Sequence, residues 1–126
     1  MTQPTRREVR TDRASNPVFS YSQGIAFGDL LFIAGQVPRN PLTGVVPATF
    51  IEQARQTLDN LSEVALAGGT SLANAVKVNV YLDDLESIHD LETIYRDYFS
   101  APFPVRTTVR AGLRGYLVEI DAIVAL

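Results

Sequence analysis

Apolar residues between positions 49 and 67 recur every three or four places, which is the spacing of one side of a helix. Thr49 and Glu52 stand three residues apart at the start of this segment, as in a capping box, where the side chains satisfy free backbone amides. Gly68 and Gly69 follow it, and glycine commonly ends a helix. The pattern therefore predicts a helix over residues 49–67.

A second helix is expected from Asp83 to about Phe99. Asp83 and Glu86 repeat the capping-box spacing, and the prolines after Ala101 end the helical pattern. The predicted inner side of this helix carries Leu85, Ile88, Leu91, Ile94, Tyr95 and Tyr98.

Other segments are short and β-forming, and several alternate apolar with polar residues, which is typical of half-buried strands. Between two such runs stand Gly28 and Asp29, a pair typical of a two-residue turn, so a β-hairpin is predicted there. The expected strands are residues 6–10, 25–27, 30–36, 75–81, 104–110 and 117–124.

Residues 112–115 carry paired glycines, so the last two strands are expected to form a strand–turn–strand unit. Arg106 and Thr108 share one face of the first strand, and Glu119 lies on one face of the second. If residues 112–115 form a four-residue loop, Thr108 lies opposite Glu119 and the polar residues of the two strands share one face of the sheet. A shift of the strand register by one residue would place them on opposite faces. That face is either a solvated surface with an ordinary ion pair, or a site where an arginine binds a carboxylate beside a glutamate that handles a proton or water.

The order of strands, helix, strand, helix and strands indicates an α+β fold with both helices on one face of a sheet. At 126 residues the chain is expected to form a single domain, residues 1–126. The other face of the sheet carries valines and an aromatic residue among polar groups and has no cover within the chain. We therefore expect self-association through that face.

Composition narrows the classes of function. The net charge is −3, so no broad attraction to nucleic acid is expected. The chain has no cysteine and a single histidine, which excludes disulfides, a thiolate nucleophile and a multi-histidine metal site. Arg6, Arg7, Arg10 and Arg13 cluster near the N-terminus without an apolar segment behind them, so we expect an exposed basic edge rather than a targeting peptide. No apolar run has the length of a membrane span, and a cytoplasmic protein without membrane contacts is the expectation.

Six short motifs are weak signals singly but specific in their order and spacing. They are Tyr21-Ser22-Gln23-Gly24, Phe32-Ile33-Ala34-Gly35-Gln36-Val37-Pro38, residues 53–61, Val76-Lys77-Val78-Asn79-Val80-Tyr81, Phe103-Pro104-Val105-Arg106-Thr107-Thr108-Val109 and Val118-Glu119-Ile120-Asp121-Ala122. With them the chain resembles the Rid family (also called YjgF/YER057c/UK114) from about Tyr21 to Val124. The characterised members of that family are enamine and imine deaminases.

The resemblance implies a chorismate-mutase-like fold of the bacillus type, with a mixed sheet, and a homotrimer whose sheets pack into a central barrel. Three ligand clefts would lie between neighbouring subunits, and the trimer would cover the open sheet face. The implied partners are other copies of the chain and a small carboxylate substrate, with no nucleic acid.

The resemblance also implies roles for individual residues. In the family, the arginine that matches Arg106 binds the substrate carboxylate, and the glutamate that matches Glu119 positions or activates the attacking water. Tyr21 matches a tyrosine that lines the cleft, and Gly35 matches a residue that contributes backbone groups. Thr108 stands where the family often has cysteine. Hydrolysis of a carboxylate-bearing imine needs the anion fixed, a water held beside the carbon and a proton moved to ammonia, so no metal or organic cofactor is required.

Two residues depart from the deaminase-active group of the family. Ala34 replaces a serine, which removes a hydroxyl donor, and Glu92 aligns with an asparagine of the cleft. If Glu92 faces the cleft, its charge would disfavour small anionic substrates or raise the pKa of a neighbouring acid such as Glu119.

The leading hypothesis is a cofactor-free deaminase that hydrolyses reactive enamines or imines, such as 2-iminopropionate, to 2-oxo acids and ammonia. A deaminase of 2-aminomuconate-like compounds is a variant of the same hypothesis. The main alternative is a small-carboxylate-binding homotrimer without turnover. A ribonuclease has little support, because the acidic chain offers no basic groove or nucleolytic pair.

Overall fold

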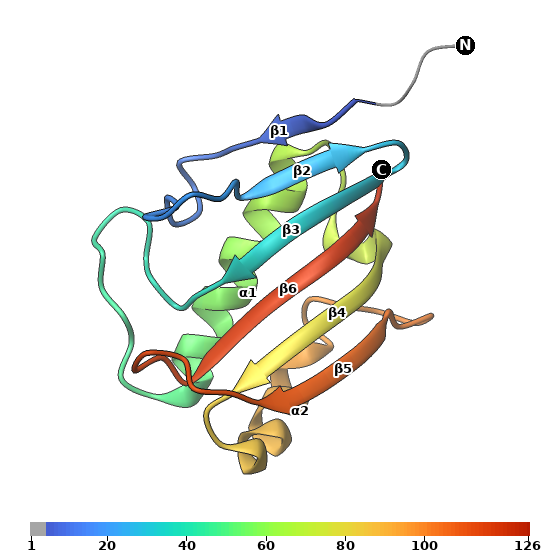
Figure 1. Ribbon diagram of the computed structural model, residues 1–126. Helices are drawn as coiled ribbons and strands as arrows, with labels where there is room; N and C mark the ends of the chain where they lie inside the picture. Colours follow the sequence, from blue (N-terminus) through green and yellow to red (C-terminus); the bar gives the residue numbers. More distant parts are fainter. Residues whose placement is uncertain (1–4) are drawn as a thin grey trace.

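A computed structural model describes residues 5–126, in which six strands form one mixed sheet with two α-helices together on one face (Figure 1). The strands are β1 (Arg7–Val9), β2 (Gly24–Phe27), β3 (Leu30–Gln36), β4 (Ala75–Leu82), β5 (Val105–Arg110) and β6 (Val118–Ala125). Across the sheet their order is β1-β2-β3-β6-β4-β5, and every neighbouring pair is antiparallel except β4 and β5. The α+β prediction with a mixed sheet and both helices on one face is confirmed.

The first helix, α1 (Phe50–Ala67), follows its sequence signals closely. The Thr49 hydroxyl accepts a bond from the Glu52 backbone N–H at 3.3 Å and donates to the Glu52 carboxylate at 2.7 Å. At the other end the Gly68 N–H donates to the Val64 carbonyl at 3.0 Å. The polar cap and the glycine stop therefore set the limits of this helix within one residue of the prediction.

The second helix begins later and ends earlier than expected. Asp84, not Asp83, is the capping residue, because its carboxylate accepts the Glu86 N–H at 3.0 Å. A 3₁₀ turn (Leu85–Ser87) comes next, followed by α2 (Ile88–Tyr95), and Leu85 is exposed rather than directed inward. The predicted inner-side residues that are buried are Leu91, Ile94 and Tyr95. Neither helix of residues 5–126 combines the length and the apolar character that a bilayer span requires.

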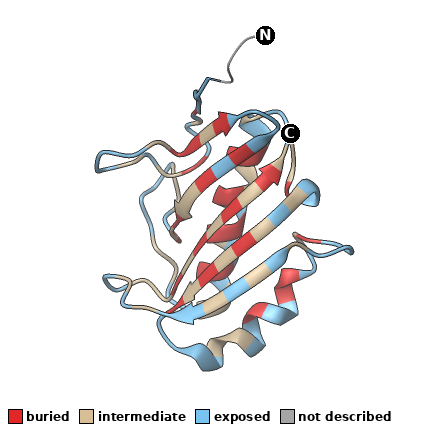
Figure 2. Cartoon of the chain, turned by 45° about the vertical axis from the view of Figure 1, so that its right-hand side comes forward, coloured by how far each residue is buried: buried red, intermediate tan, exposed pale blue. Residues whose placement is uncertain are grey.

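The hydrophobic core lies between the helices and the sheet, and the strands alternate between buried and more exposed positions (Figure 2). Strand β6 shows the pattern most clearly, since every second residue faces the helices. Its buried residues are Val118, Ile120, Ala122 and Val124. The residues between them point to the open face of the sheet, which no element of residues 5–126 covers (Figure 1).

The predicted pairing of the last two strands is wrong. Strand β4 lies between β5 and β6, so Thr108 is opposite Val80, and Val80 is opposite Ile120 on its other side. Burial explains the difference, because β6 is buried at alternate positions and takes a central place with partners on both edges. Strand β5, which has no fully buried residue, forms the edge of the sheet.

Two other local predictions are confirmed. Strands β2 and β3 form a hairpin through Gly28 and Asp29, and Gly28 takes a positive φ of 61° that suits glycine. At the opposite edge from β5, strand β1 and its neighbours expose the predicted basic cluster, Arg6, Arg7, Arg10 and Arg13.

Candidate functional site

Glu119 lies on the open face of the sheet, packed directly over Gly35 of β3. A Cβ atom added to Gly35 would lie 2.9 Å from Cδ of Glu119 and closer still to its carboxylate oxygen. Real Cβ atoms do not approach other heavy atoms so closely, so any other residue at position 35 would displace the Glu119 side chain. The glycine therefore leaves the space that the Glu119 carboxylate occupies.

The surroundings of Glu119 favour its neutral form. Burial, and secondarily the negative charge of Asp121, raises the pKa of Glu119 above its ordinary value of 4.5. Asp121 is itself held in place, because it accepts bonds from the Asn79 amide and from the Tyr81 hydroxyl, both at 2.9 Å. A carboxyl with a raised pKa is a stronger base than an ordinary glutamate and can return the proton that it accepts.

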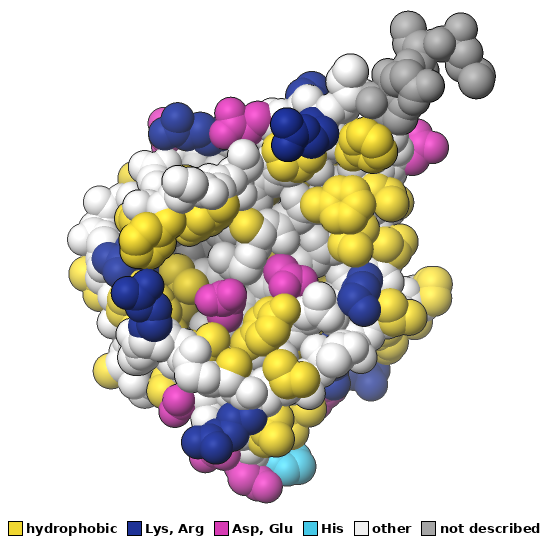
Figure 3. Space-filling model, viewed as in Figure 1, with side chains coloured by type: hydrophobic (Ala, Val, Ile, Leu, Met, Phe, Trp, Pro, Cys, Tyr) yellow, Lys and Arg dark blue, Asp and Glu magenta, His cyan; other side chains and the backbone are white. Residues whose placement is uncertain are grey.

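A cavity of about 540 Å³ opens beside Glu119. Its walls come from three segments distant in sequence, namely residues 15–21, residues 35–39 and residues 112–116. Figure 3 views this face and shows acidic side chains near the centre of the hollowed surface, with hydrophobic and basic side chains around them. The structure thus brings together three of the predicted site residues, Tyr21, Gly35 and Glu119.

Arg106 lies on the other side of the sheet. In β5 it is opposite Val78, whose side chain is buried under the helices. One nitrogen of its guanidinium is 2.5 Å from a carboxylate oxygen of Glu92, and its central carbon lies 4.7 Å from the centroid of the Tyr95 ring. Both contacts are made by side chains of α2, so Arg106 faces the helical layer.

A second cavity, of about 340 Å³, is lined by Arg106 and Glu92. Glu92 therefore belongs with Arg106 and not with Glu119 in one subunit. Thr108 lies on the same side of β5 as Arg106 and lines neither cavity. The predicted site residues consequently form two groups on opposite faces of one sheet.

Sequence reasoning missed the polar residues on the wall of the Glu119 cavity. Arg39 donates to the Tyr116 hydroxyl at 2.7 Å, which joins two segments 77 positions apart. The guanidinium of Arg114 lies 5.6 Å from the centroid of the Phe19 ring. Neither arginine belongs to a recognisable sequence motif, and only the folded chain brings them beside Glu119.

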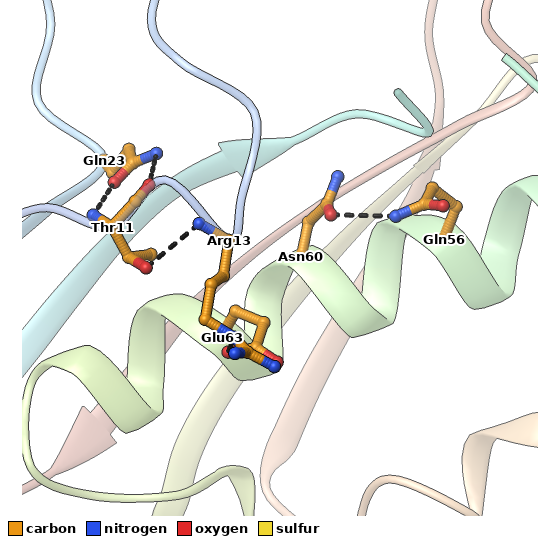
Figure 4. Close-up of polar contacts among 6 residues, drawn as sticks. All are labelled: Thr11, Arg13, Gln23, Gln56, Asn60 and Glu63. Carbon is orange, nitrogen blue, oxygen red and sulfur yellow. Dashed lines mark hydrogen bonds and ion pairs between the residues drawn. The ribbon is translucent and has the colours of Figure 1, made fainter. Parts of the chain in front are cut away.

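A buried amide on α1 fixes one wall of this cavity. The side-chain N–H groups of Asn60 donate to the carbonyls of Val37 and Arg39 at 3.1 and 2.9 Å. Its oxygen accepts a bond from Gln56 at 2.9 Å, one turn earlier in the helix (Figure 4). Asn60 is thus fully satisfied on both sides and holds the Val37–Arg39 backbone against the helix.

A second buried amide fixes the opposite wall. Gln23 accepts the Thr11 N–H at 2.7 Å and donates to the Thr11 carbonyl at 3.0 Å (Figure 4). The same nitrogen donates to the Ser15 carbonyl at 3.0 Å. Gln23 therefore anchors the segment that leads into residues 15–21 of the cavity wall.

Within residues 5–126, no group of three or more His, Cys, Asp or Glu side chains is placed to hold a metal ion. The polar groups of both cavities are instead suited to anions, water and protons. The arrangement offers a carboxyl of raised pKa in one cavity and a guanidinium in the other.

The family model described as endoribonuclease L-PSP matches residues 11–126, nearly the whole chain. The chain belongs to this family, the Rid (YjgF) family. Its fold and the positions of Tyr21, Gly35 and Glu119 around one cavity agree with that membership.

Known relatives span almost the full length of the chain. A RutC family protein, y4sK, from Sinorhizobium fredii is 43% identical over 121 residues, which cover 94% of this chain and 96% of that protein. The 2-iminobutanoate/2-iminopropanoate deaminase of Escherichia coli is 34% identical over 122 residues, covering 93% and 95%. The crystal structure of RidA from the Antarctic bacterium Psychrobacter is similar with a TM-score of 0.91 and 34% identity, covering 96% of this chain and all of that one.

Proposed function

We propose that this Rid-family protein is an enamine and imine deaminase that converts 2-imino carboxylates and their enamine tautomers to 2-oxo acids and ammonia. The observation that carries the proposal is the Glu119 carboxyl, which packs over Gly35, lines an open cavity and has a raised pKa. The Escherichia coli relative named as a 2-iminobutanoate/2-iminopropanoate deaminase supports the same reaction.

In the proposed reaction Glu119 handles the proton of the attacking water. The water oxygen bonds to the carbon of the protonated imine as Glu119 takes one proton of the water. The electrons of the broken carbon–nitrogen π bond move to the nitrogen, which becomes an amine. Glu119 then returns this proton to the nitrogen, and the carbon–nitrogen bond breaks with its electron pair going to nitrogen. The hydroxyl group on the carbon gives its own proton to the solvent as it becomes the carbonyl, and ammonia and the 2-oxo acid leave. The raised pKa suits both steps, because the group must be a base first and an acid afterwards.

The proposal requires an arginine for the substrate carboxylate, and in one subunit Arg106 lies on the wrong face of the sheet. We therefore propose a homotrimer in which β5 of one subunit brings Arg106 to the Glu119 cavity of the next. A head-to-tail contact of this kind closes into a ring with one cleft at each interface. The open sheet face supports association, because it exposes Phe27, Leu30, Phe32, Val105 and Val109.

Within such a cleft, Arg106 would hold the substrate carboxylate with its planar fork. Tyr21 and Gly35 would shape the wall around the reacting carbon, and Thr108 would contribute mainly backbone groups. Glu92 would limit affinity, because it already pairs with Arg106 and competes with a substrate carboxylate.

That ion pair is also the observation that favours a second candidate, a carboxylate-binding homotrimer without turnover. An arginine occupied by Glu92, together with the missing hydroxyl at Ala34, would weaken the positioning of a substrate. The two candidates differ in one measurable property, the release of ammonia.

The test is the release of ammonia and 2-oxo acid from freshly generated imino acids of varied side chain. We expect the wild-type protein to exceed the buffer rate and Arg106→Ala to lose activity by about a hundredfold or more. Arg110→Ala is the matched control, since Arg110 lies on the same strand and bonds the Asp83 carbonyl. Sedimentation of all three proteins checks that the assembly is unchanged. Equal background rates for wild type and Arg106→Ala, with a carboxylate still bound, would select the binding protein instead.

A further inference from the structure

Two arginines on the wall of the Glu119 cavity have no acidic partner within residues 5–126. The ion pairs of this part of the chain involve Arg13, Arg55, His89 and Arg106, and leave out Arg39 and Arg114. The partner of Arg39 is a neutral hydroxyl and that of Arg114 is an aromatic ring. The positive charge of each guanidinium is therefore not offset by a carboxylate of the described residues.

The charges that line the cavity are unbalanced. Among the residues that line the cavity in the described part of the chain, Glu119 is the only acidic one. Burial raises the pKa of its carboxyl, which favours the neutral form of this group. Two permanent positive charges thus face at most one negative charge. An anionic group is the natural occupant of such a surface.

The two arginines are also held in place before any ligand binds. The Arg39 backbone carbonyl accepts a bond from the buried Asn60 amide, and one guanidinium nitrogen is tied to the Tyr116 hydroxyl. A guanidinium has five N–H donors, so most of the Arg39 donors remain for a ligand. Arg114 has a positive φ of 58°, an uncommon conformation for a residue other than glycine, and its guanidinium lies over the Phe19 ring.

The size of the cavity agrees with a ligand larger than a three-carbon imino acid. Its volume of about 540 Å³ falls within the range of sites for small organic molecules. The aromatic residues Phe19, Tyr21 and Tyr116 line the same cavity as the two arginines and Glu119. The cavity can therefore hold a carbon chain with an acidic group at its far end.

We propose that Arg39 and Arg114 bind a second carboxylate, so that the preferred substrates are 2-imino dicarboxylates, the imines of acidic amino acids. The inference rests on the proposed function, since Glu119 is taken as the reacting group and Arg106 of a neighbouring subunit as the site of the first carboxylate. A planar guanidinium matches a carboxylate in two parallel hydrogen bonds, which favours this group over a neutral polar side chain.

The test compares imines generated in place by amino acid oxidases from alanine and 2-aminobutyrate with those from aspartate and glutamate. For the wild-type protein, kcat/KM for the imine of aspartate or glutamate is expected to be about tenfold higher than for the imines of alanine and 2-aminobutyrate. One charge-assisted hydrogen bond is enough for a difference of this size. Arg39→Gln and Arg114→Gln should each lower the ratio of dicarboxylate to monocarboxylate activity by about fivefold to tenfold. The control Arg10→Gln, at an exposed arginine outside the cavity, should leave the ratio unchanged.

A further variant separates charge from wall structure. Tyr116→Phe removes the hydroxyl that Arg39 bonds but keeps the guanidinium. This variant should retain most of the preference for dicarboxylates. A loss of the preference equal to that of Arg39→Gln, or a wild type without any preference, would overturn the inference.

Binding of the 2-oxo acid products distinguishes failure of this inference from failure of the proposed function. Calorimetry with 2-oxoglutarate and pyruvate needs no turnover. Tighter binding of 2-oxoglutarate that is lost in Arg39→Gln would support the second carboxylate site even in a protein that releases no ammonia. Equal affinities for the two acids in wild type would overturn it, whatever the deaminase assay shows.

Discussion

Arg106 and Glu119 lie on opposite faces of one sheet, separated by β4. Arg106 pairs with Glu92 on the helical side, whereas Glu119 lies over Gly35 on the open side. One subunit therefore cannot present both groups to a single small substrate. In the proposed homotrimer the two groups meet because they come from different subunits, and this relationship makes assembly part of the catalytic mechanism.

Glu119→Gln is predicted to abolish deamination and to stabilise the fold at neutral pH. The folded state raises the pKa of Glu119, so it binds the proton more tightly than the unfolded chain does. The proton on Glu119 therefore adds to the free energy of unfolding. This contribution is fully present below the ordinary pKa of 4.5 and is lost as the pH rises through the pKa of Glu119 in the folded protein. Above that window the glutamine variant should gain up to about 1 kcal/mol, a modest figure because the half-buried group is partly screened by solvent.

Denaturant unfolding of both proteins across pH 4 to 9, at one protein concentration, measures this difference. The advantage of the glutamine variant should grow with pH and then level off. An advantage that is constant across the range would contradict the raised pKa.

Gly35→Ala is predicted to displace the Glu119 carboxylate and to lower kcat by about tenfold to a hundredfold, a partial loss of the roughly hundredfold to ten-thousandfold that general acid–base catalysis contributes. Adding Gly35→Ala to Glu119→Gln should then cost little more, because both changes remove the same group. Gly112→Ala is the comparison, since a Cβ atom at that position meets no atom within 4 Å. Full activity of Gly35→Ala would show that the position of Glu119 does not matter.

Glu92→Asn is predicted to improve the turnover of small imino acids by lowering KM. The change removes the Glu92 carboxylate, which competes with the substrate carboxylate for Arg106. In this ion pair the Arg106 side chain is largely buried and the Glu92 side chain is half exposed. Solvent-exposed ion pairs contribute about 0.2–1 kcal/mol, and this pair is still open to solvent on the Glu92 side, so the gain should reach at most about fivefold. Steady-state kinetics with 2-iminopropionate checks it, and an unchanged or higher KM would argue against the competition.

Asn60→Ala is predicted to destabilise the protein by about 1–3 kcal/mol, because it removes the side-chain donor to the Arg39 carbonyl and one of the two donors to the Val37 carbonyl at a buried position. Arg55→Ala removes an exposed ion pair with Asp97 and should cost clearly less than Asn60→Ala, because solvent screens the pair. Urea unfolding compares the two variants. Equal losses would mean that the amide does not hold the cavity wall.

Local signals in the sequence predicted local structure well. The Thr49 cap, the glycine stop after residue 67 and the Gly28–Asp29 turn each act over a few residues, and each lies where it was expected. The cap before the second helix was misplaced by one residue, because Asp83 and Asp84 are adjacent and either could have served as the cap. The α-helix itself begins only at Ile88, after a 3₁₀ turn that the capping pattern did not predict.

Long-range relationships were harder to predict. Residues 104–124 look like a hairpin from their own sequence, but the buried face of β6 makes it pair with β3 and β4. The resulting split of Arg106 from Glu119 could not be foreseen from two strands alone. Arg39 and Arg114 were missed for the same reason, since their loops meet only in the folded chain.

The central claim, a site shared between subunits, is tested most directly by mixing two inactive variants. Arg106→Ala and Glu119→Gln are unfolded together in equal amounts, refolded and assayed beside each parent and the wild type. Random assembly of a ring leaves about a quarter of the clefts with both groups intact, so roughly a quarter of wild-type activity should return. A mixture as inactive as its parents, although subunits have exchanged, would contradict the shared site.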